Sequence, residues 1–280
     1  MFDTSEKNPT IPSYLYWITW VECSVVFMAA VLLFFLPGVA QNLWAWEIPP
    51  YNSRFVGTIY FSAYIPLIIL WVTKRWSPGR LILWMIFVFT ASVMLVMFIH
   101  WESFAWSRMA TYLVFWPLYI FLPINSALHL YWYRNVEAPP ATQMPASWRS
   151  LLFGMALLLT AYGLGLLIAP ESLTRFWPWP VDAFHGQMYA SAFLTPAVGC
   201  WWLAYYGETP AEDLVIGLNL LSAGFLTITG ILLTSVAAPA ERQVDLLAPG
   251  VWAFIFMFAF SGVVGLALTL RARSKRLTLQ

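Results

Sequence analysis

The sequence predicts an all-α integral membrane protein with eight transmembrane helices, arranged as two parallel four-helix repeats with both termini in the cytoplasm. Composition, the distribution of basic residues and an internal repeat predict this fold. Of the 280 residues, 61% are hydrophobic and 10% are charged, whereas a soluble domain has roughly 45–50% and about 25%. No polar stretch is long enough to fold separately, so the composition excludes a soluble globular protein.

Eight segments are apolar enough to cross a bilayer, which takes about 20 residues because a helix must satisfy its own backbone in hydrocarbon. They are residues 14–36, 55–72, 81–99, 110–133, 151–168, 187–206, 214–235 and 248–270. The chain therefore divides into a cytoplasmic tail (1–13), a first half (14–136), a cytoplasmic linker (137–148), a second half (149–271) and a basic cytoplasmic tail (272–280).

The basic residues support eight spans and give an orientation. Eight spans place ten of the 14 Lys and Arg residues on the side of the termini and four on the other side. Because positive charge is retained in the cytoplasm, both termini are predicted to be cytoplasmic. The ten are Lys7, Lys74, Arg75, Arg80, Arg134, Arg149, Arg271, Arg273, Lys275 and Arg276, and the four are Arg54, Arg108, Arg175 and Arg242.

An internal repeat relates the two halves. Each half has a proline followed seven residues later by Trp-x-Trp, and then Gly-x-x-Tyr-x-Ser-Ala at the start of the next span. The first copy contains Pro37, Trp44, Trp46 and Gly57, and the second contains Pro170, Trp177, Trp179 and Gly186. With four spans in each half, both copies lie on the same side, so the repeat is predicted to be parallel and not inverted.

The two halves differ in composition. The first half holds 11 of the 17 Trp, and the second holds 12 of the 15 Gly. Small residues let transmembrane helices approach closely, so the second half is predicted to be the tighter bundle. The first half is then expected to have more outward-facing or ligand-facing aromatic surface; alternatively, bulky side chains simply fill a looser bundle.

Six tryptophans lie in the predicted outer connections, where they form an aromatic platform. Tryptophan at this depth is typical of an interfacial belt at the level of lipid headgroups. Alternatively, the rings and neighbouring prolines form a rigid docking surface for a pigment, a quinone or a partner subunit. The six are Trp44, Trp46, Trp101, Trp106, Trp177 and Trp179.

Glu22 is the most informative polar residue, because it lies about 12 Å into the first span. An intramembrane carboxylate is costly and usually faces a bundle interior or a cavity, which makes it a candidate functional residue. Asn125 and His129 are four residues apart on the fourth span, so they share one face of it. Both lie in the same half of the membrane as Glu22, and so does Asn219 on the seventh span. These four residues are predicted to form a proton-handling or ligand-orienting cluster. Alternatively, a protonated Glu22 hydrogen-bonds a neighbouring helix.

His100 and His185 fall at the outer ends of spans, beside the aromatic loops. A neutral imidazole there can ligate the iron of a haem or the magnesium of a chlorophyll-type pigment. A bound quinone is a third cofactor hypothesis, and the alternative for both residues is a hydrogen-bonded interfacial histidine. No further metal site and no catalytic residue is predicted, because nucleotide-loop, zinc and nucleophile motifs are absent from the sequence.

The segment IPPYNSRFVGTIY at residues 48–60 resembles a group of uncharacterised bacterial integral membrane proteins. In that group a tryptophan loop leads into a Pro-Pro-Phe-Asn-x-Arg-Phe-x-Gly-Ala-x-Tyr-like helix start. This chain has Tyr51 and Thr58 in place of the Phe and Ala. The resemblance covers the first half, with an echo at residues 177–192. It implies a multi-pass protein of the bacterial inner membrane and no particular activity.

Two functional hypotheses follow. The first is a non-catalytic accessory or scaffold subunit of a larger bacterial membrane complex, respiratory or photosynthetic, which docks on partner subunits through the Trp-rich outer face. The second is a small secondary transporter or channel with a site near Glu22, Asn125 and His129. The expected surroundings are a lipid bilayer, and the net charge of +1 does not suggest a nucleic-acid partner.

Overall fold

The computed structural model describes residues 8–136, 141–207 and 209–278, the last without the side chains of 275–278. No β-strand occurs among these residues. The long helices are α1 (Ser13–Phe35), α3 (Pro50–Thr73), α4 (Trp76–Ile99), α5 (Trp116–Trp132), α6 (Ala146–Ile168), α8 (Ala183–Tyr206), α9 (Pro210–Ala237) and α10 (Pro249–Thr278). The short helical segments are α2 (Pro37–Leu43), η1 (Trp101–Ser103), η2 (Ala110–Phe115), α7 (Pro170–Leu173) and η3 (Ala240–Arg242).

Within the described residues, seven helices are long and apolar enough to cross a membrane. They are α1, α3, α4, the continuous helix formed by η2 and α5, α6, α9 and α10. The protein is therefore an all-helical, multi-pass membrane protein, as the composition predicts. Parts of the predicted N-terminal tail (1–7), linker (137–140) and C-terminal tail (279–280) lie outside the described residues.

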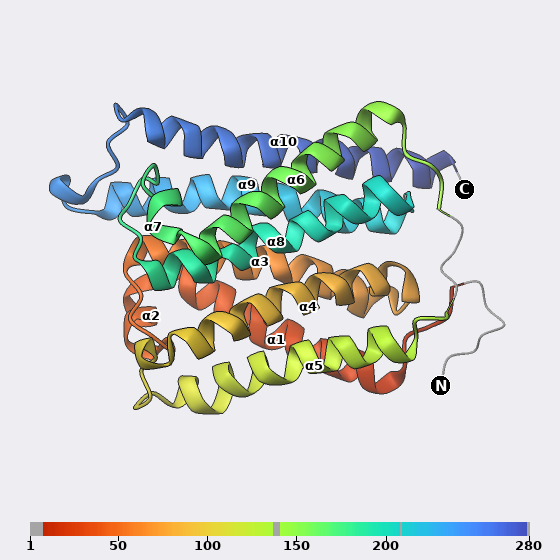
Figure 1. The fold of residues 1–280 in the computed structure, drawn as a ribbon, viewed down its shortest axis with the longest axis horizontal. Helices are drawn as coiled ribbons and strands as arrows, with labels where there is room; N and C mark the ends of the chain where they lie inside the picture. Colours follow the sequence, from red (N-terminus) through yellow and green to blue (C-terminus); the bar gives the residue numbers. More distant parts are fainter. Residues whose placement is uncertain (1–7, 137–140, 208, 279–280) are drawn as a thin grey trace.

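The remaining long helix, α8, differs from the seven in composition and in position. It has 24 residues, as α3 and α4 do, but it carries His185, Gln187 and many small residues. It packs against α6 and α4 in the middle of the bundle, and most of its side chains are buried (Figure 1). Because neighbouring helices surround α8, its surface does not have to be uniformly apolar.

The helix contacts within residues 14–136 follow the same order as those within residues 149–271. Within the halves, α1 packs on α3 as α6 packs on α8, and α4 packs on α5 as α9 packs on α10. Between the halves, α3 packs on α9, and α8 packs on α4. The second long helix of each half thus contacts the third long helix of the other half, which interlocks the two halves.

The first helix of each half begins and ends in the same way. Both α1 and α6 have 23 residues and follow a proline, Pro12 or Pro145, with similar extended backbone angles. Both end at a residue that turns the chain, Leu36 at φ −123° and ψ 50° and Ala169 at φ −138° and ψ 58°. A short helix starting with proline follows each turn, as proline favours the first helical position.

The connections α2, η1, α7 and η3 gather at one end of the bundle, called the outer end below (Figure 1). Helix α1 starts and α10 ends at the opposite, inner end. Buried hydrophobic residues form two clusters, one that includes the outer connections and one nearer the inner end. At the inner end the segment before α1 is fixed to the α3–α4 turn, since Ile11 N–H donates to the Lys74 carbonyl at 2.9 Å.

The second half packs closely along α9 and α10, as its glycine content predicts. A Cβ atom at Gly224 would lie 2.5 Å from the carbonyl oxygen of Phe258 and 2.6 Å from Cα of Gly262. The two backbones approach this closely because neither residue 224 nor residue 262 has a side chain. The equivalent helices of the first half, α4 and η2–α5, contain no glycine beyond Gly79, so bulkier side chains separate them.

Candidate functional site

A cavity of about 640 Å³, called the first-half cavity below, lies mainly between α1, α3, α4 and the helix formed by η2 and α5, and Thr195 of α8 and Asn219 of α9 complete its lining. Its walls are almost wholly apolar. Met28 of α1 and Leu113 of η2 belong to the lining, yet each is exposed by about 60%. The cavity therefore opens sideways between α1 and η2, toward the region that lipid chains occupy in a membrane.

Glu22 lines this cavity. The residue is 7% exposed, and its carboxyl accepts or donates no hydrogen bond within the described part of the chain. It lies nine residues after the start of α1, which places it about 13 Å along the helix axis. The structure adds the empty space beside this buried acid.

Asn219 of α9 lines the same cavity, whereas Asn125 and His129 of α5 are not part of its lining. Nδ2 of Asn219 donates to the Ser62 carbonyl at 2.8 Å, and its Oδ1 has no partner among the described residues. Of the four residues in the predicted cluster, the structure therefore brings only Glu22 and Asn219 to one cavity.

His129 lies near the inner end, among aromatic rings. Its Nδ1 donates to the Asn125 carbonyl at 2.7 Å, and its ring centroid lies 5.0 Å from that of Tyr14. Nε2 of His129 is buried and has no partner within the described residues. Asn125 and His129 do share one face of α5, as their spacing predicts, but that face meets the first turn of α1.

Two tyrosine hydroxyls form a buried pair in the cavity wall, which the sequence analysis missed. The hydroxyl oxygens of Tyr60 and Tyr119 are 2.8 Å apart, and both residues line the cavity. Since one hydroxyl donates to the other, one of the two protons remains available to a third group. Tyr60 belongs to the repeated Gly-x-x-Tyr sequence, and this repetition was the only feature of the sequence that could have marked it as a candidate site residue.

The π-helix η2 shapes the outer part of the cavity. The Trp116 N–H bonds the Thr111 carbonyl, five residues back, in place of the usual fourth residue. Pro117 follows and has no N–H with which to bond Leu113, so an ordinary α-helical pattern is interrupted at this point. Leu113 and other η2 side chains then line the cavity. The Trp-Pro pair was the sequence signal for this irregular turn.

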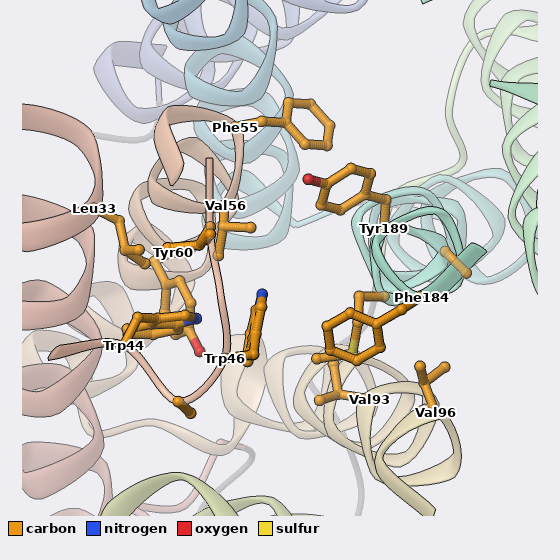
Figure 2. Packing of buried hydrophobic residues seen from close by; sticks show 14 of the residues in the cluster. Leu33, Trp44, Trp46, Phe55, Val56, Tyr60, Val93, Val96, Phe184 and Tyr189 are labelled. Carbon is orange, nitrogen blue, oxygen red and sulfur yellow. The ribbon is translucent and has the colours of Figure 1, made fainter. Parts of the chain in front are cut away.

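Four of the six outer tryptophans are core residues, which corrects the predicted aromatic platform. Trp44, Trp46, Trp177 and Trp179 are at most 8% exposed. Figure 2 shows Trp44 and Trp46 pointing inward among rings such as those of Tyr60 and Phe184. The distribution of basic residues assigns a loop to one side of the membrane but does not give the direction of its side chains. Here the side chains of both Trp-x-Trp loops point into the bundle. Trp101 is 49% exposed and Trp106 is half-buried.

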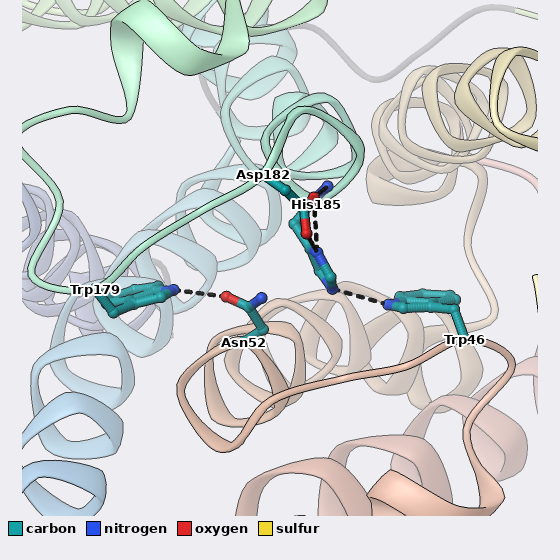
Figure 3. A network of polar contacts seen from close by, with 5 residues as sticks. All are labelled: Trp46, Asn52, Trp179, Asp182 and His185. Atoms are coloured by element: carbon teal, nitrogen blue, oxygen red, sulfur yellow. Dashed lines mark hydrogen bonds and ion pairs between the residues drawn. The ribbon is translucent and has the colours of Figure 1, made fainter. Parts of the chain in front are cut away.

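Two of these tryptophans make reciprocal hydrogen bonds between the halves (Figure 3). Nε1 of Trp46, in the first half, donates to Nε2 of His185 at 3.2 Å at the start of α8. Nε1 of Trp179, in the second half, donates to Oδ1 of Asn52 at 2.6 Å at the start of α3. Each Trp-x-Trp loop thus holds the N-terminal turn of the second long helix in the other half.

Both ring nitrogens of His185 are used within the chain. Because an indole N–H only donates, Nε2 accepts from Trp46, and Nδ1 therefore carries the proton that is donated to Asp182 at 2.8 Å. Burial raises the pKa of the Asp182 carboxyl, but the hydrogen bonds that it accepts from the His185 side chain and backbone outweigh this effect and leave the pKa below its ordinary value. Asp182 also accepts the His185 backbone N–H as the N-cap of α8.

His100, the other candidate pigment or haem ligand, is hydrogen-bonded through Nε2 to Oε1 of Gln187. Its ring packs on Phe184 at 5.3 Å between centroids. Within the described residues, no group of three or more His, Cys, Asp or Glu side chains is placed to hold a metal ion. The structure therefore gives both histidines hydrogen-bonding roles at the outer ends of α4 and α8.

Comparison with known proteins finds no matching family model, no similar curated protein and no similar solved structure.

Proposed function

We propose that this chain is an eight-span protein of the bacterial inner membrane, built from two parallel four-helix repeats, with both termini in the cytoplasm. The central, parallel course of α8 supports an eighth span, although its composition is less apolar (Figure 1). The repeat is supported by the equivalent helix contacts and by the matching bounds of α1 and α6. The ten-to-four division of basic residues supports the orientation.

We further propose that the protein binds an elongated, largely apolar small molecule in the first-half cavity. The observation that carries this proposal is a cavity of about 640 Å³ with apolar walls and very few polar groups. Small-molecule sites of roughly 300–1,000 Å³ typically combine such walls with a small number of placed polar groups. The proposed site includes Glu22 from the transporter hypothesis but excludes Asn125 and His129, which do not line the cavity. We propose that the protein binds this molecule and make no proposal that it transports it.

Energetics favour an occupied cavity. An apolar space loses van der Waals contacts if it is empty, and a cavity that is open to the bilayer can be filled by a lipid-soluble molecule or a lipid chain. The side opening allows a molecule dissolved in the bilayer to enter without crossing water. A lipid-soluble ligand of low polarity is therefore the class of molecule that fits.

A filled-cavity variant tests this function. Ala29 lines the cavity, so Ala29→Phe places a ring in the binding space, whereas Ala253→Phe adds the same ring to the exposed face of α10. The test compound is decylbenzene, and binding to the detergent-solubilised protein is measured by native mass spectrometry. We expect Ala29→Phe to weaken binding at least tenfold and Ala253→Phe to leave it unchanged. Equal binding by both variants would refute the cavity as the site.

The accessory-subunit hypothesis is a second candidate, favoured by one observation. Trp101 is 49% exposed at the outer end and lies on Trp106, with ring centroids 4.1 Å apart, so a small aromatic surface is available for a partner. If a partner docks there, mild solubilisation of native membranes should recover a stoichiometric complex that Trp101→Ala disrupts. A lone, colourless protein in both preparations would argue against this candidate.

A further inference from the structure

The polar groups of the first-half cavity indicate which kind of molecule it takes. This inference rests on the proposed function and concerns the chemistry of the ligand's polar end. Only 7% of the Glu22 surface is exposed, and its carboxyl has no hydrogen-bond partner within the described chain. A buried polar group without a partner costs about 1–3 kcal/mol, and more if charged, so such a group calls for a water or a ligand.

Further hydrogen-bonding capacity lies in the lining of the same cavity as Glu22. The Glu22 carboxyl and the Tyr119 hydroxyl are near enough to interact electrostatically. The Tyr60–Tyr119 pair leaves one hydroxyl proton available, and Oδ1 of Asn219 has no partner among the described residues. These residues come from α1, α3, α5 and α9, so four helices contribute polar groups to the lining of an otherwise apolar space.

The rest of the cavity suits a hydrocarbon chain. Along α1 the lining runs from Glu22 to Leu32, ten residues or about 15 Å, which is roughly the depth of one leaflet of the hydrocarbon core. The side opening at Met28 lies within this stretch. A ligand with its polar end at Glu22 can therefore extend its chain outward through the opening into lipid.

The polar end is better uncharged than charged. A cationic group at Glu22 would form an ion pair inside an apolar cavity, where the desolvation of two charges offsets most of the attraction. An anionic group at Glu22 would meet a carboxyl without a neighbouring cation. Arg108 also lines the cavity, but at its outer end, where it donates to the Trp44 carbonyl at 2.7 Å and the Trp46 carbonyl at 3.1 Å. A hydroxyl or a carbonyl satisfies a protonated carboxyl and a tyrosine proton without such a cost.

We propose that the ligand of the first-half cavity is an amphiphile with an uncharged hydroxyl- or carbonyl-bearing head, which hydrogen-bonds Glu22 and the Tyr60–Tyr119 pair. Its hydrocarbon chain lies along α1 and leaves through the opening at Met28. Phe89 and Phe115 also line the cavity and supply apolar ring surface, so a flat cyclic head is accommodated. Quinones and phenols, or long-chain alcohols, share this chemistry.

A set of matched test compounds distinguishes these classes of ligand. Decylbenzoquinone carries carbonyls, decylphenol a hydroxyl, decylbenzylamine a positive charge and decylbenzene no polar group. Each compound has a six-membered ring and the same decyl chain, and the ring is aromatic in all but the quinone. Linear 1-hexadecanol tests whether the ring is needed. Binding to the full-length protein is measured by native mass spectrometry, with thermal unfolding to check that each variant is folded.

We expect the wild-type protein to bind the quinone or the phenol at least tenfold more tightly than decylbenzene, about 1.4 kcal/mol. Glu22→Leu should remove this preference while leaving decylbenzene binding intact, and Tyr119→Phe should reduce it. Glu22→Gln should retain most of it, because an amide donates a hydrogen bond as a protonated carboxyl does. Glu171→Leu, which removes an exposed acid outside the cavity, should change nothing.

Two results would overturn the inference. A preference for the quinone or phenol that survives Glu22→Leu and Tyr119→Phe would place the head elsewhere. Tightest binding of decylbenzylamine, lost in Glu22→Leu, would show a cationic ligand. Either result leaves decylbenzene binding and its loss in Ala29→Phe intact, so failure of this inference is distinct from failure of the proposed function.

Discussion

The close contact of α9 with α10 makes a quantitative prediction about Gly224. In Gly224→Ala the new Cβ would meet two backbone atoms of α10, the Phe258 carbonyl oxygen at 2.5 Å and Gly262 Cα at 2.6 Å. Backbone atoms in a helix cannot rotate away as a side chain can. The two helices must therefore separate by several tenths of an ångström along their contact, and neighbouring van der Waals contacts are lost with it.

The cost follows from general magnitudes of overpacking. Forcing an extra carbon into a closely packed interface costs about 1–3 kcal/mol. Gly154→Ala in α6 is the matched control, because a Cβ there meets nothing within 4 Å. Alanine favours a helix over glycine by about 1 kcal/mol, so the control should be neutral or stabilising. Because both variants gain this helix propensity, it cancels, and the two are expected to differ by the overpacking cost alone, about 1–3 kcal/mol.

Unfolding in mixed micelles measures this difference. The purified variants are titrated with a denaturing detergent, and the unfolding free energy is read from loss of helical circular dichroism and from tryptophan fluorescence. Equal stability of Gly224→Ala and Gly154→Ala would refute the close approach of α9 and α10. A large loss in both variants would show that glycine is needed for another reason.

The remaining predictions concern the contacts between the halves and the topology. Trp46→Phe leaves Nε2 of His185 buried without its donor and should cost about 1–3 kcal/mol in the same unfolding assay. Asp182 has a pKa below its ordinary value of 3.8, so its stabilising effect is complete above 3.8 and should be lost as the pH falls through the lower value of the folded protein. Asp182→Asn should abolish that part of the pH dependence. In whole cells, an impermeant thiol reagent should label Ser103→Cys in the outer connection but not Asn135→Cys at the inner end, because eight spans place them on opposite sides.

Each of these predictions has a control. Trp101→Phe replaces a half-exposed indole by a phenyl ring and leaves no buried acceptor without its donor, so it should change stability little. A loss of stability equal to that of Trp46→Phe would contradict the proposed role of the Trp46–His185 hydrogen bond. Glu102→Gln, on the exposed η1 segment, should leave the acid unfolding profile unchanged. Labelling at both introduced cysteines or at neither would contradict the topology, since Cys23 and Cys200 are buried.

Much of the fold follows from hydropathy and helix-end signals. The first span is predicted at residues 14–36 and α1 occupies 13–35, because apolar length and the proline after it fix both ends. The second is predicted to begin at residue 55, whereas α3 begins at Pro50. Residues 50–54 are too polar to count as membrane-spanning, but Pro50 at the first helical position starts the helix there.

The site was harder to predict because it depends on contacts between distant residues. The burial of Trp46 requires His185, 139 residues away, and no local pattern contains that information. Glu22 was predictable because an intramembrane acid is rare and its depth follows from helix rise. The cavity beside it was not, since it exists only where α1 and η2 leave space between them. His129 was placed on the correct face of α5, but which helix meets that face is set by tertiary packing.

The most direct measurement is an experimental structure of the protein purified from its native membrane without delipidation. The account predicts one elongated density in the first-half cavity, with its polar end beside Glu22 and Tyr119 and its chain leaving at Met28. A cavity closed by its own side chains, or one containing only water, would contradict it.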